Sequence, residues 1–436
     1  MTAMRRVVNA SVLVGALFGV DKIAGLARQV IVARAYGVGA ELDAYNAANN
    51  LPDALFALIS GGALAIAFIP VLAEVRAQGG RPALWALFAR VVNLAFLVTA
   101  GAAGLIALFP LPLVQTLIAP GFTPEQQTLV ADLMRLNLLA TLVFSISGLV
   151  MGALQAEQHF LLPALAPLFY NLGQIAGVLV GEPRWGIYGL AWGTVAGAVL
   201  HLAIQLPGLL RHEFTWQPAL TLTDPGVRRV LRLMGPRILT IACFNLIFIA
   251  NDNLASRFPA GAVTALAYAW LIMQLPETVL GTAAGVALLP TLSELAARGD
   301  RAGLRGLLRR ALAVLLVLTV PIVAAAWFLL PLAVRLVFEG RAFTAESSAL
   351  VVQAARLMML GLVGHALKEV AARTFYALQD ARPPLVTAAI NLMVFVGLGL
   401  ALTPTLGFSA LALANSVSFT LEAGLMLVIL YRRKIL

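Results

Sequence analysis

A cluster of charged residues stands inside an otherwise apolar segment near the start of the chain. In the stretch GVDKIAGLARQVIVARAYGVGAELDAY, residues 19–45, the ionisable side chains include Asp21, Lys22, Arg28, Arg34 and Asp43. Arginine binds phosphate groups through a planar fork with two hydrogen bonds, and lysine binds them as a point charge. The segment therefore carries cations that could hold an anionic substrate.

The two deepest cations are Lys22 and Arg28. A helix over residues 8–35 has its midpoint near Lys22, and Arg28 lies about 9 Å further along at about 1.5 Å per residue. Each cation costs roughly 2.5–3.5 kcal/mol if it faces lipid at the membrane centre. One explanation is an internal ion pair, since Asp21 and Arg28 lie on nearly the same helix face. The other is a water-filled cationic cavity, which is favoured because one aspartate cannot neutralise every cation here.

The composition is that of a membrane protein. Of the 436 residues, 61% are hydrophobic and 11% are charged, whereas soluble domains are about 25% charged. The net charge of +10 comes from short basic clusters between apolar runs, which is typical of topology signals and not of a nucleic-acid-binding surface. A single cysteine, Cys243, and histidines without ligand spacing predict no metal site.

About 20 apolar residues cross a bilayer, and this length predicts an all-α polytopic membrane protein with about 12 transmembrane helices. Lysine and arginine gather in the loops on the side of both termini, so the positive-inside rule places both termini in the cytoplasm. The expected spans are 8–35, 43–73, 84–109, 129–154, 161–181, 186–210, 230–255, 262–292, 307–330, 349–377, 384–404 and 407–431.

The two halves of the sequence repeat each other. Three matched pairs occur in the same order: 51–80 with 275–300, 111–123 with 330–344, and 152–172 with 376–392. The pattern predicts a duplicated six-helix unit, with an N-terminal lobe over 1–215 and a C-terminal lobe over 216–436. Because six is even, the copies are parallel repeats, and a binding site is expected between the lobes.

The longest motif resembles a known family. The stretch from Asp21 to Glu74, which begins DKIAGLARQVIVARAYGVGAELDAY, is similar to the N-terminal signature of the MurJ/MviN lipid II flippases of the MOP superfamily, and ARTFYALQDARPP (372–384) resembles that family's loop between helices ten and eleven. The similarity in order and spacing extends along essentially the whole chain.

The resemblance implies a fold and a function. An N-lobe and a C-lobe would enclose a cationic central cavity in the bacterial cytoplasmic (inner) membrane. Undecaprenyl-pyrophosphate-linked peptidoglycan precursor, lipid II, would move from the cytoplasmic to the periplasmic leaflet by alternating access. The expected partners are this lipid-linked precursor, membrane lipids and proteins of cell-wall synthesis.

The resemblance also implies roles for single residues. Lys22 stands where the family has an arginine, and Arg28 matches a second family arginine, so both would bind the pyrophosphate, with Arg34 nearby. Asp43 matches the aspartate at the start of helix two and would pair with a basic residue in one state of the cycle.

The sequence departs from the family pattern in helices two and eight. Uncharged residues stand where the family commonly has charged ones: Phe56, Ala57, Gly61, Trp270 and Leu271. These departures leave open a second hypothesis, a MOP-type exporter of another polyprenyl-linked oligosaccharide or of a drug.

The sequence indicates a transporter and not an enzyme. It has no phosphate-binding loop of the G-x-x-x-x-G-K-[ST] type, and its extracytoplasmic loops are short, so no cofactor is expected. The driving force would be the membrane potential, worth about 2.3 kcal/mol per charge per 100 mV, or a coupled Na⁺ or H⁺. Asn251, Asp252 and Asp380 are the candidate ion-coupling residues, with helix-end capping as the alternative for these polar groups.

Overall fold

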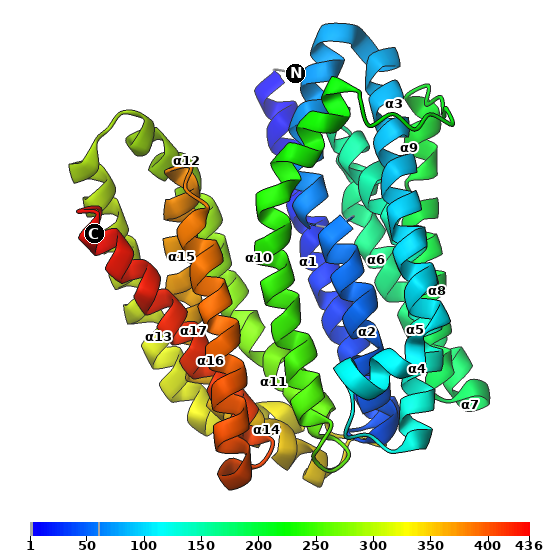
Figure 1. Cartoon of the computed structure of the whole chain (residues 1–436), viewed down its shortest axis with the longest axis vertical. Helices are drawn as coiled ribbons and strands as arrows, with labels where there is room; N and C mark the ends of the chain where they lie inside the picture. Colours follow the sequence, from blue (N-terminus) through cyan, green and yellow to red (C-terminus); the bar gives the residue numbers. More distant parts are fainter. Residues whose placement is uncertain (1–2, 60–61) are drawn as a thin grey trace. The chain divides into compact units, whose positions relative to one another are not determined.

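The computed structural model describes residues 3–59 and 62–436, without the side chains of 3–16, 18, 62–67, 236 and 237. Within this part every regular element is a helix (Figure 1). The elements are α1 (Ala3–Tyr36), α2 (Ala40–Ile59), α3 (Gly62–Leu108), α4 (Pro110–Leu113), η1 (Val114–Ile118), α5 (Pro124–Ala156), α6 (Leu161–Ala176), η2 (Gly177–Gly181), α7 (Glu182–Trp185), α8 (Ile187–Ala203), α9 (Leu206–Arg211), α10 (Pro225–Ala255), α11 (Ala262–Glu277), η3 (Thr278–Thr282), α12 (Ala283–Ala297), α13 (Arg301–Phe338), α14 (Ala345–Met359), α15 (Leu362–Ala377), α16 (Arg382–Leu406) and α17 (Ser409–Arg432).

The predicted all-α polytopic fold is confirmed. Among the described residues, nine helices are long and apolar enough to cross a membrane, and ten if α14 and α15, bent by 47°, form one span. The described parts of α1 and α2 are not among them. The expected number of 12 spans therefore stays a prediction.

The chain folds into two compact units. The N-terminal unit comprises Met1–Gly37, Ala47–Thr116 and Thr123–Ala242, and the C-terminal unit comprises Val38–Asn46, Leu117–Phe122 and Cys243–Leu436. The helix α10 continues from the first unit into the second. The lobe boundary expected after residue 215 stays a prediction.

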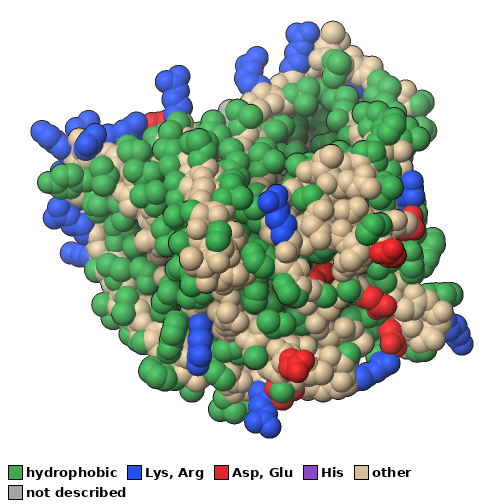
Figure 2. All heavy atoms as spheres, turned by 60° about the horizontal axis from the view of Figure 1, so that its bottom comes forward, with side chains coloured by type: hydrophobic (Ala, Val, Ile, Leu, Met, Phe, Trp, Pro, Cys, Tyr) green, Lys and Arg blue, Asp and Glu red, His purple; other side chains and the backbone are tan. Residues whose placement is uncertain are grey.

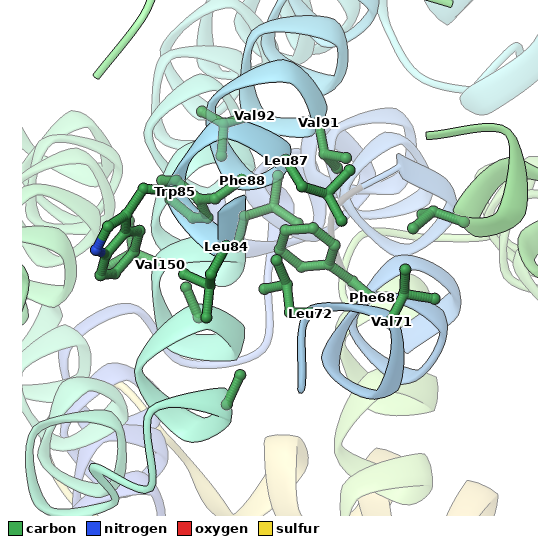
Figure 3. Packing of buried hydrophobic residues seen from close by; sticks show 14 of the residues in the cluster. Phe68, Val71, Leu72, Leu84, Trp85, Leu87, Phe88, Val91, Val92 and Val150 are labelled. Atoms are coloured by element: carbon green, nitrogen blue, oxygen red, sulfur yellow. The ribbon is translucent and has the colours of Figure 1, made fainter. Parts of the chain in front are cut away.

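Helix α3 folds back on itself in the N-terminal unit. Gly80 interrupts it with φ 70° and ψ −168°, a conformation that glycine adopts without steric cost. Figure 3 shows side chains from both arms meeting: Phe68 and Leu72 precede the bend, and Leu84 and Phe88 follow it. Each of these four side chains is at most 2% exposed, so the two arms share one apolar core.

The outer surface is largely apolar. On the face in Figure 2, hydrophobic side chains predominate, and most Lys and Arg side chains lie towards the edges of the view. Leu105, Val317 and Phe328, in helices long enough to span a membrane, are 65%, 71% and 77% exposed. Such a surface is costly in water and is suited to the hydrocarbon core of a bilayer.

A seam of glycines joins α6 and η2 to α8. The pairs are Gly173 with Gly197, Gly177 with Gly193, and Gly181 with Gly189. A Cβ atom added to Gly177 would lie 2.3 Å from the Cα of Gly193, so the two backbones touch. Small residues allow such close helix packing in membranes. The seam also brings Gln174 of α6 within 2.8 Å of the Thr194 hydroxyl of α8.

Substitution in the seam should destabilise the protein. We expect Gly177→Ala to lower the free energy of unfolding by about 1–3 kcal/mol, the usual cost of overpacking, because its methyl group would meet backbone atoms that cannot rotate away. Gly101→Ala in α3 is the matched control, since its added Cβ has no neighbour within 4 Å. Thermal unfolding in lipid nanodiscs measures both variants, and equal midpoints would contradict the prediction.

Candidate functional site

Arg28 lies on the face of α1 that packs against α6. Its Nη1 atom donates a hydrogen bond of 2.6 Å to Oε1 of Gln174. The amide of Gln174 is itself oriented, because its Nε2 atom donates to the Tyr170 hydroxyl at 2.9 Å and to the Thr194 hydroxyl at 2.8 Å. The guanidinium group is thus held by a neutral acceptor that leaves its positive charge in place.

Asp21 lies on the same face of α1 as Gly25 and Arg28. It precedes Gly25 by about one helical turn and Arg28 by about two turns. Nδ2 of Asn171 on α6 donates to the Asp21 carboxylate at 2.9 Å. The shared face of Asp21 and Arg28 therefore agrees with the sequence prediction, but each side chain binds an amide of α6 and they do not bind each other. The internal ion pair between these two residues is not formed in the structure.

Lys22 and Arg34 lie elsewhere on α1. Both side chains are exposed, and Lys22 forms no ion pair with any residue that the structure describes. Arg34 belongs to the last turn of the helix, next to Tyr36, whose hydroxyl donates to the carbonyl oxygen of Gly186 at 3.1 Å. The roles of Lys22, Arg28 and Arg34 in substrate binding stay predictions.

A polar cavity of about 290 Å³ lies within the N-terminal unit. It is lined by residues of α2, α5, α6 and α8: Asn49, Pro52, Asp53, Phe56, Asn137, Ala140, Thr141, Phe144, Pro167, Tyr170, Thr194 and His201. Nδ2 of Asn137 donates to Oδ1 of Asn49 at 2.9 Å. The Asp53 side chain is exposed to the cavity and lies within electrostatic range of Arg28. Our sequence reasoning missed Asp53, although an acid inside the apolar run LPDALFALI was a usable signal.

Asp43 caps a helix in the C-terminal unit. Its carboxylate accepts hydrogen bonds from the backbone N–H of Gly261 at 2.6 Å and of Thr264 at 2.7 Å. These are the N-cap and third residues of α11, whose N-terminal dipole favours a negative charge. Asp43 is 1% exposed, and both carboxylate oxygens are engaged. Its expected pairing with a basic residue during a cycle stays a prediction.

Two of the three candidate ion-coupling residues, Asn251 and Asp252, contact each other, and the third, Asp380, binds a different partner. Nδ2 of Asn251 donates to Oδ1 of Asp252 at 3.0 Å on α10. Asp380 follows α15 and binds Arg433 at 2.7 Å. In the described part of the chain, no group of three or more His, Cys, Asp or Glu side chains could hold a metal ion. Ion coupling at these three residues therefore remains a prediction.

The ion pair of Asp380 should make stability depend on pH. The hydrogen bond from Arg433 holds the pKa of this carboxyl below its usual value. A lowered pKa means that the pair stabilises the fold above the ordinary aspartate pKa and that this contribution is lost as the pH falls through the folded-state pKa. We expect Asp380→Asn to lower the unfolding midpoint at neutral pH and to match the parent protein in acid. Glu346→Gln, at an exposed position, is the control, and a difference that persists in acid would contradict this.

Phe56 and Trp270 stand at two positions where the family commonly has a charged residue, and both pack against another aromatic ring. The rings of Phe56 and Phe144 lie 5.4 Å apart in the N-terminal unit, and those of Trp270 and Phe248 lie 5.2 Å apart in the C-terminal unit. Ala57 and Leu271 are partly buried, and Gly61 lies outside the described residues.

The sequence model of the family described as "Lipid II flippase MurJ" matches residues 32–436. The chain belongs to the MurJ family. The "Lipid II flippase MurJ" of Burkholderia cenocepacia is 32% identical over 429 residues, which cover 95% of this chain and 82% of that protein. The "Probable lipid II flippase MurJ" of Rhizobium tropici is 30% identical, with coverage of 96% and 80%.

Solved structures show the same fold. The "Lipid II flippase MurJ, inward closed conformation" superposes with a TM-score of 0.82 at 22% identity, covering 97% of this chain and 89% of that one. A multidrug resistance MATE family transporter of the MOP superfamily in an inward-facing conformation gives a TM-score of 0.80 at 16% identity, with coverage of 95% and 94%. The MurJ family's description as flippases supports a transport role and not a catalytic one, and the chain is a multi-pass inner membrane protein.

Proposed function

We propose that this chain is a flippase that moves lipid II from the cytoplasmic to the periplasmic leaflet by alternating access. The observation that carries the proposal is the match of residues 32–436 to the MurJ family. Both termini are proposed to lie in the cytoplasm, as the distribution of basic loops favours.

Arg28 is proposed to bind the pyrophosphate of the substrate. Gln174 occupies Nη1 of the guanidinium group, which has five N–H donors in all, so several donors remain for phosphate oxygens. Because the hydrogen-bond acceptor of Arg28 is a neutral amide, the anion need not displace a carboxylate from that bond. Lys22, exposed and six residues earlier on the same helix, adds a second positive charge.

Asp53 supports a release step in the same unit. Its carboxylate lies within electrostatic range of Arg28, so it competes with the pyrophosphate for that positive charge. A competing anion weakens the binding of the substrate without removing it, which a transporter needs in order to release its cargo. Asp53→Asn is therefore expected to bind substrate more tightly and to transport it more slowly.

Growth rescue tests the proposal. The wild-type chain is expressed in bacteria depleted of their own lipid II flippase, at matched membrane levels, and labelled lipid II at the periplasmic leaflet is measured together with growth. Rescue with restored labelling is expected. Folded, membrane-inserted protein that restores neither would overturn the assignment.

A further inference from the structure

A second group of charged residues lies within the C-terminal unit, on α15. Nζ of Lys368 lies 3.3 Å from Oε1 of Glu369, and Nη2 of Arg373 lies 3.6 Å from Oε2 of the same residue. The side chains of Lys368 and Glu369 are only 16% and 21% exposed. Lys368 also lies over the ring of Phe419 at 5.2 Å, so its ammonium group is enclosed by a carboxylate and an aromatic face.

Two more carboxylates approach Lys368 from neighbouring helices. Glu277 ends α11, and Glu422 lies near the middle of α17; both are within electrostatic range of Lys368. The hydroxyl of Thr282 donates to Glu277 at 3.1 Å. These residues are five apart, a spacing that the π-helical segment η3 between them brings onto one face.

The cluster has more acids than bases. Among the described residues, Glu277, Glu369 and Glu422 lie within electrostatic range of Lys368, and Glu369 also pairs with Arg373, so three acids are set against two bases. Glu422 is only 5% exposed, and an uncompensated charge at membrane depth costs several kcal/mol. The balance is restored if the cluster takes up one positive charge.

That charge is better supplied by a proton than by a metal ion. Lys368 already places an ammonium group among the carboxylates, and a metal cation entering beside it would be repelled. The described residues also contain no carboxylate and histidine group able to hold a metal. A proton needs only one carboxylate oxygen and one hydrogen-bond acceptor.

Asn391 on α16 provides such an acceptor. It is 1% exposed, and its Nδ2 atom donates to Oε2 of Glu422 at 2.6 Å, whereas its Oδ1 atom is buried without a partner. Rotation of the amide by half a turn would present Oδ1 to a Glu422 hydroxyl. Asn391 can therefore serve either form of the carboxyl group, donating to the anion and accepting from the acid.

We propose that Glu422 binds and releases a proton within this cluster, with Asn391 as its hydrogen-bond partner in both forms. We further infer that this proton is the ion coupled to transport, and this part of the inference rests on the proposed function. The proton adds to a carboxylate oxygen of Glu422 and leaves from the same atom, so the residue alternates between anion and neutral acid.

On the described helices packed against α17, two further basic side chains bind other groups. On α15, His365 binds Oδ1 of Asn415 at 3.2 Å and stacks on Phe419. On α14, Arg356 donates to the carbonyl oxygen of Trp327 and lies over that ring. Among the described residues, Lys368 and Glu369 of α15 lie within electrostatic range of Glu422, while Arg373 and Glu277 join the cluster through Glu369 and Lys368.

The internal repeat supports the same site. Glu277 in LPE and Asp53 in LPD occupy matching positions of the two copies, as do Asn391 and Asn171. Both asparagines donate to a buried or half-buried carboxylate, Glu422 in one unit and Asp21 in the other. A carboxyl group held by an amide is thus built into each copy.

Infrared difference spectroscopy tests the site without any substrate. Wild-type protein in lipid bilayers is titrated from alkaline to acid pH, and the C=O stretching band of a protonated carboxyl in an apolar environment is followed. We expect a titrating band that is absent in Glu422→Gln and retained in Glu294→Gln, which alters an exposed carboxylate paired with Arg298.

Two further variants give opposite shifts. Asn391→Leu removes the donor to the anion and should move the midpoint of the band to higher pH. Glu277→Gln frees Lys368 to interact with Glu422 and should move the midpoint to lower pH. An identical band in Glu422→Gln, or a midpoint that neither variant moves, would overturn the proposal even if one of the variants were poorly folded.

The transport arm separates this inference from the proposed function. Lipid II movement in proteoliposomes is compared with and without a pH gradient. If the pH gradient stimulates transport by the wild type but not by Glu422→Gln, coupling is supported. If the gradient does not change the transport rate of the wild type, coupling is overturned. A titrating Glu422 band in a protein that does not move lipid II would uphold the proton site and refute the substrate.

Discussion

We expect Arg28→Ala to abolish rescue of flippase-depleted bacteria, although the variant should reach the membrane at wild-type levels. The guanidinium group would form at least two charge-assisted hydrogen bonds to the pyrophosphate, each worth about 1.5–3 kcal/mol. Loss of about 3 kcal/mol corresponds to a fall in transport on the order of 100-fold. The measurement is the rate at which labelled lipid II reaches the outer leaflet.

Three companion variants sharpen this result. Arg28→Lys keeps the charge but loses the fork, so an intermediate rate is expected. Gln174→Leu keeps the arginine and removes the amide that orients it, so a smaller loss is expected. Arg135→Ala, an exposed arginine paired with Asp132 in the same unit, is the control. Normal transport by Arg28→Ala would show that the substrate is bound elsewhere.

The second large effect concerns Asp43 and the fold. Asp43→Ala leaves two buried N–H groups at the start of α11 without an acceptor, and we expect it to lower the free energy of unfolding by about 2–4 kcal/mol. Asp43→Asn keeps one carbonyl oxygen for these donors and should lose less. Thermal unfolding of the purified variants measures both.

The same pair of variants separates structure from transport. If Asp43 acts only as a cap, transport by Asp43→Asn should follow its stability and remain substantial. If the carboxylate also pairs with a cation during the cycle, Asp43→Asn should be stable and inactive. Equal stability of Asp43→Ala and the parent protein would show that the cap contributes little.

The helices themselves could be predicted well from the sequence. The expected spans 161–181 and 186–210 correspond closely to α6 with η2 and to α8 with α9, because long apolar runs end there at turns. Less of the arrangement around Arg28 could be predicted. Its partner Gln174 lies 146 residues away, and a neutral amide inside an apolar run gives no periodic signal.

Asp43 shows a second limit of sequence reasoning. Its acceptor role depends on the N-terminus of α11, 218 residues later, and nothing local to Asp43 indicates that contact. The resemblance directed attention to a pairing with basic residues. Glu422 was within reach of sequence reasoning, because a single acid in the middle of an apolar span is a recognised sign of function.

The π-helical segment Thr278–Thr282 is a place where the chain can lose one residue without breaking the helix. A π-turn accommodates one residue more than an α-turn, and each residue turns an α-helix by about 100°. Deleting one residue here would restore regular α-helix, leave the flanking helices intact and remove the alignment of Thr282 with Glu277. A chain shortened by one residue at this point would be expected to insert and fold while losing the polar face that the extra residue creates.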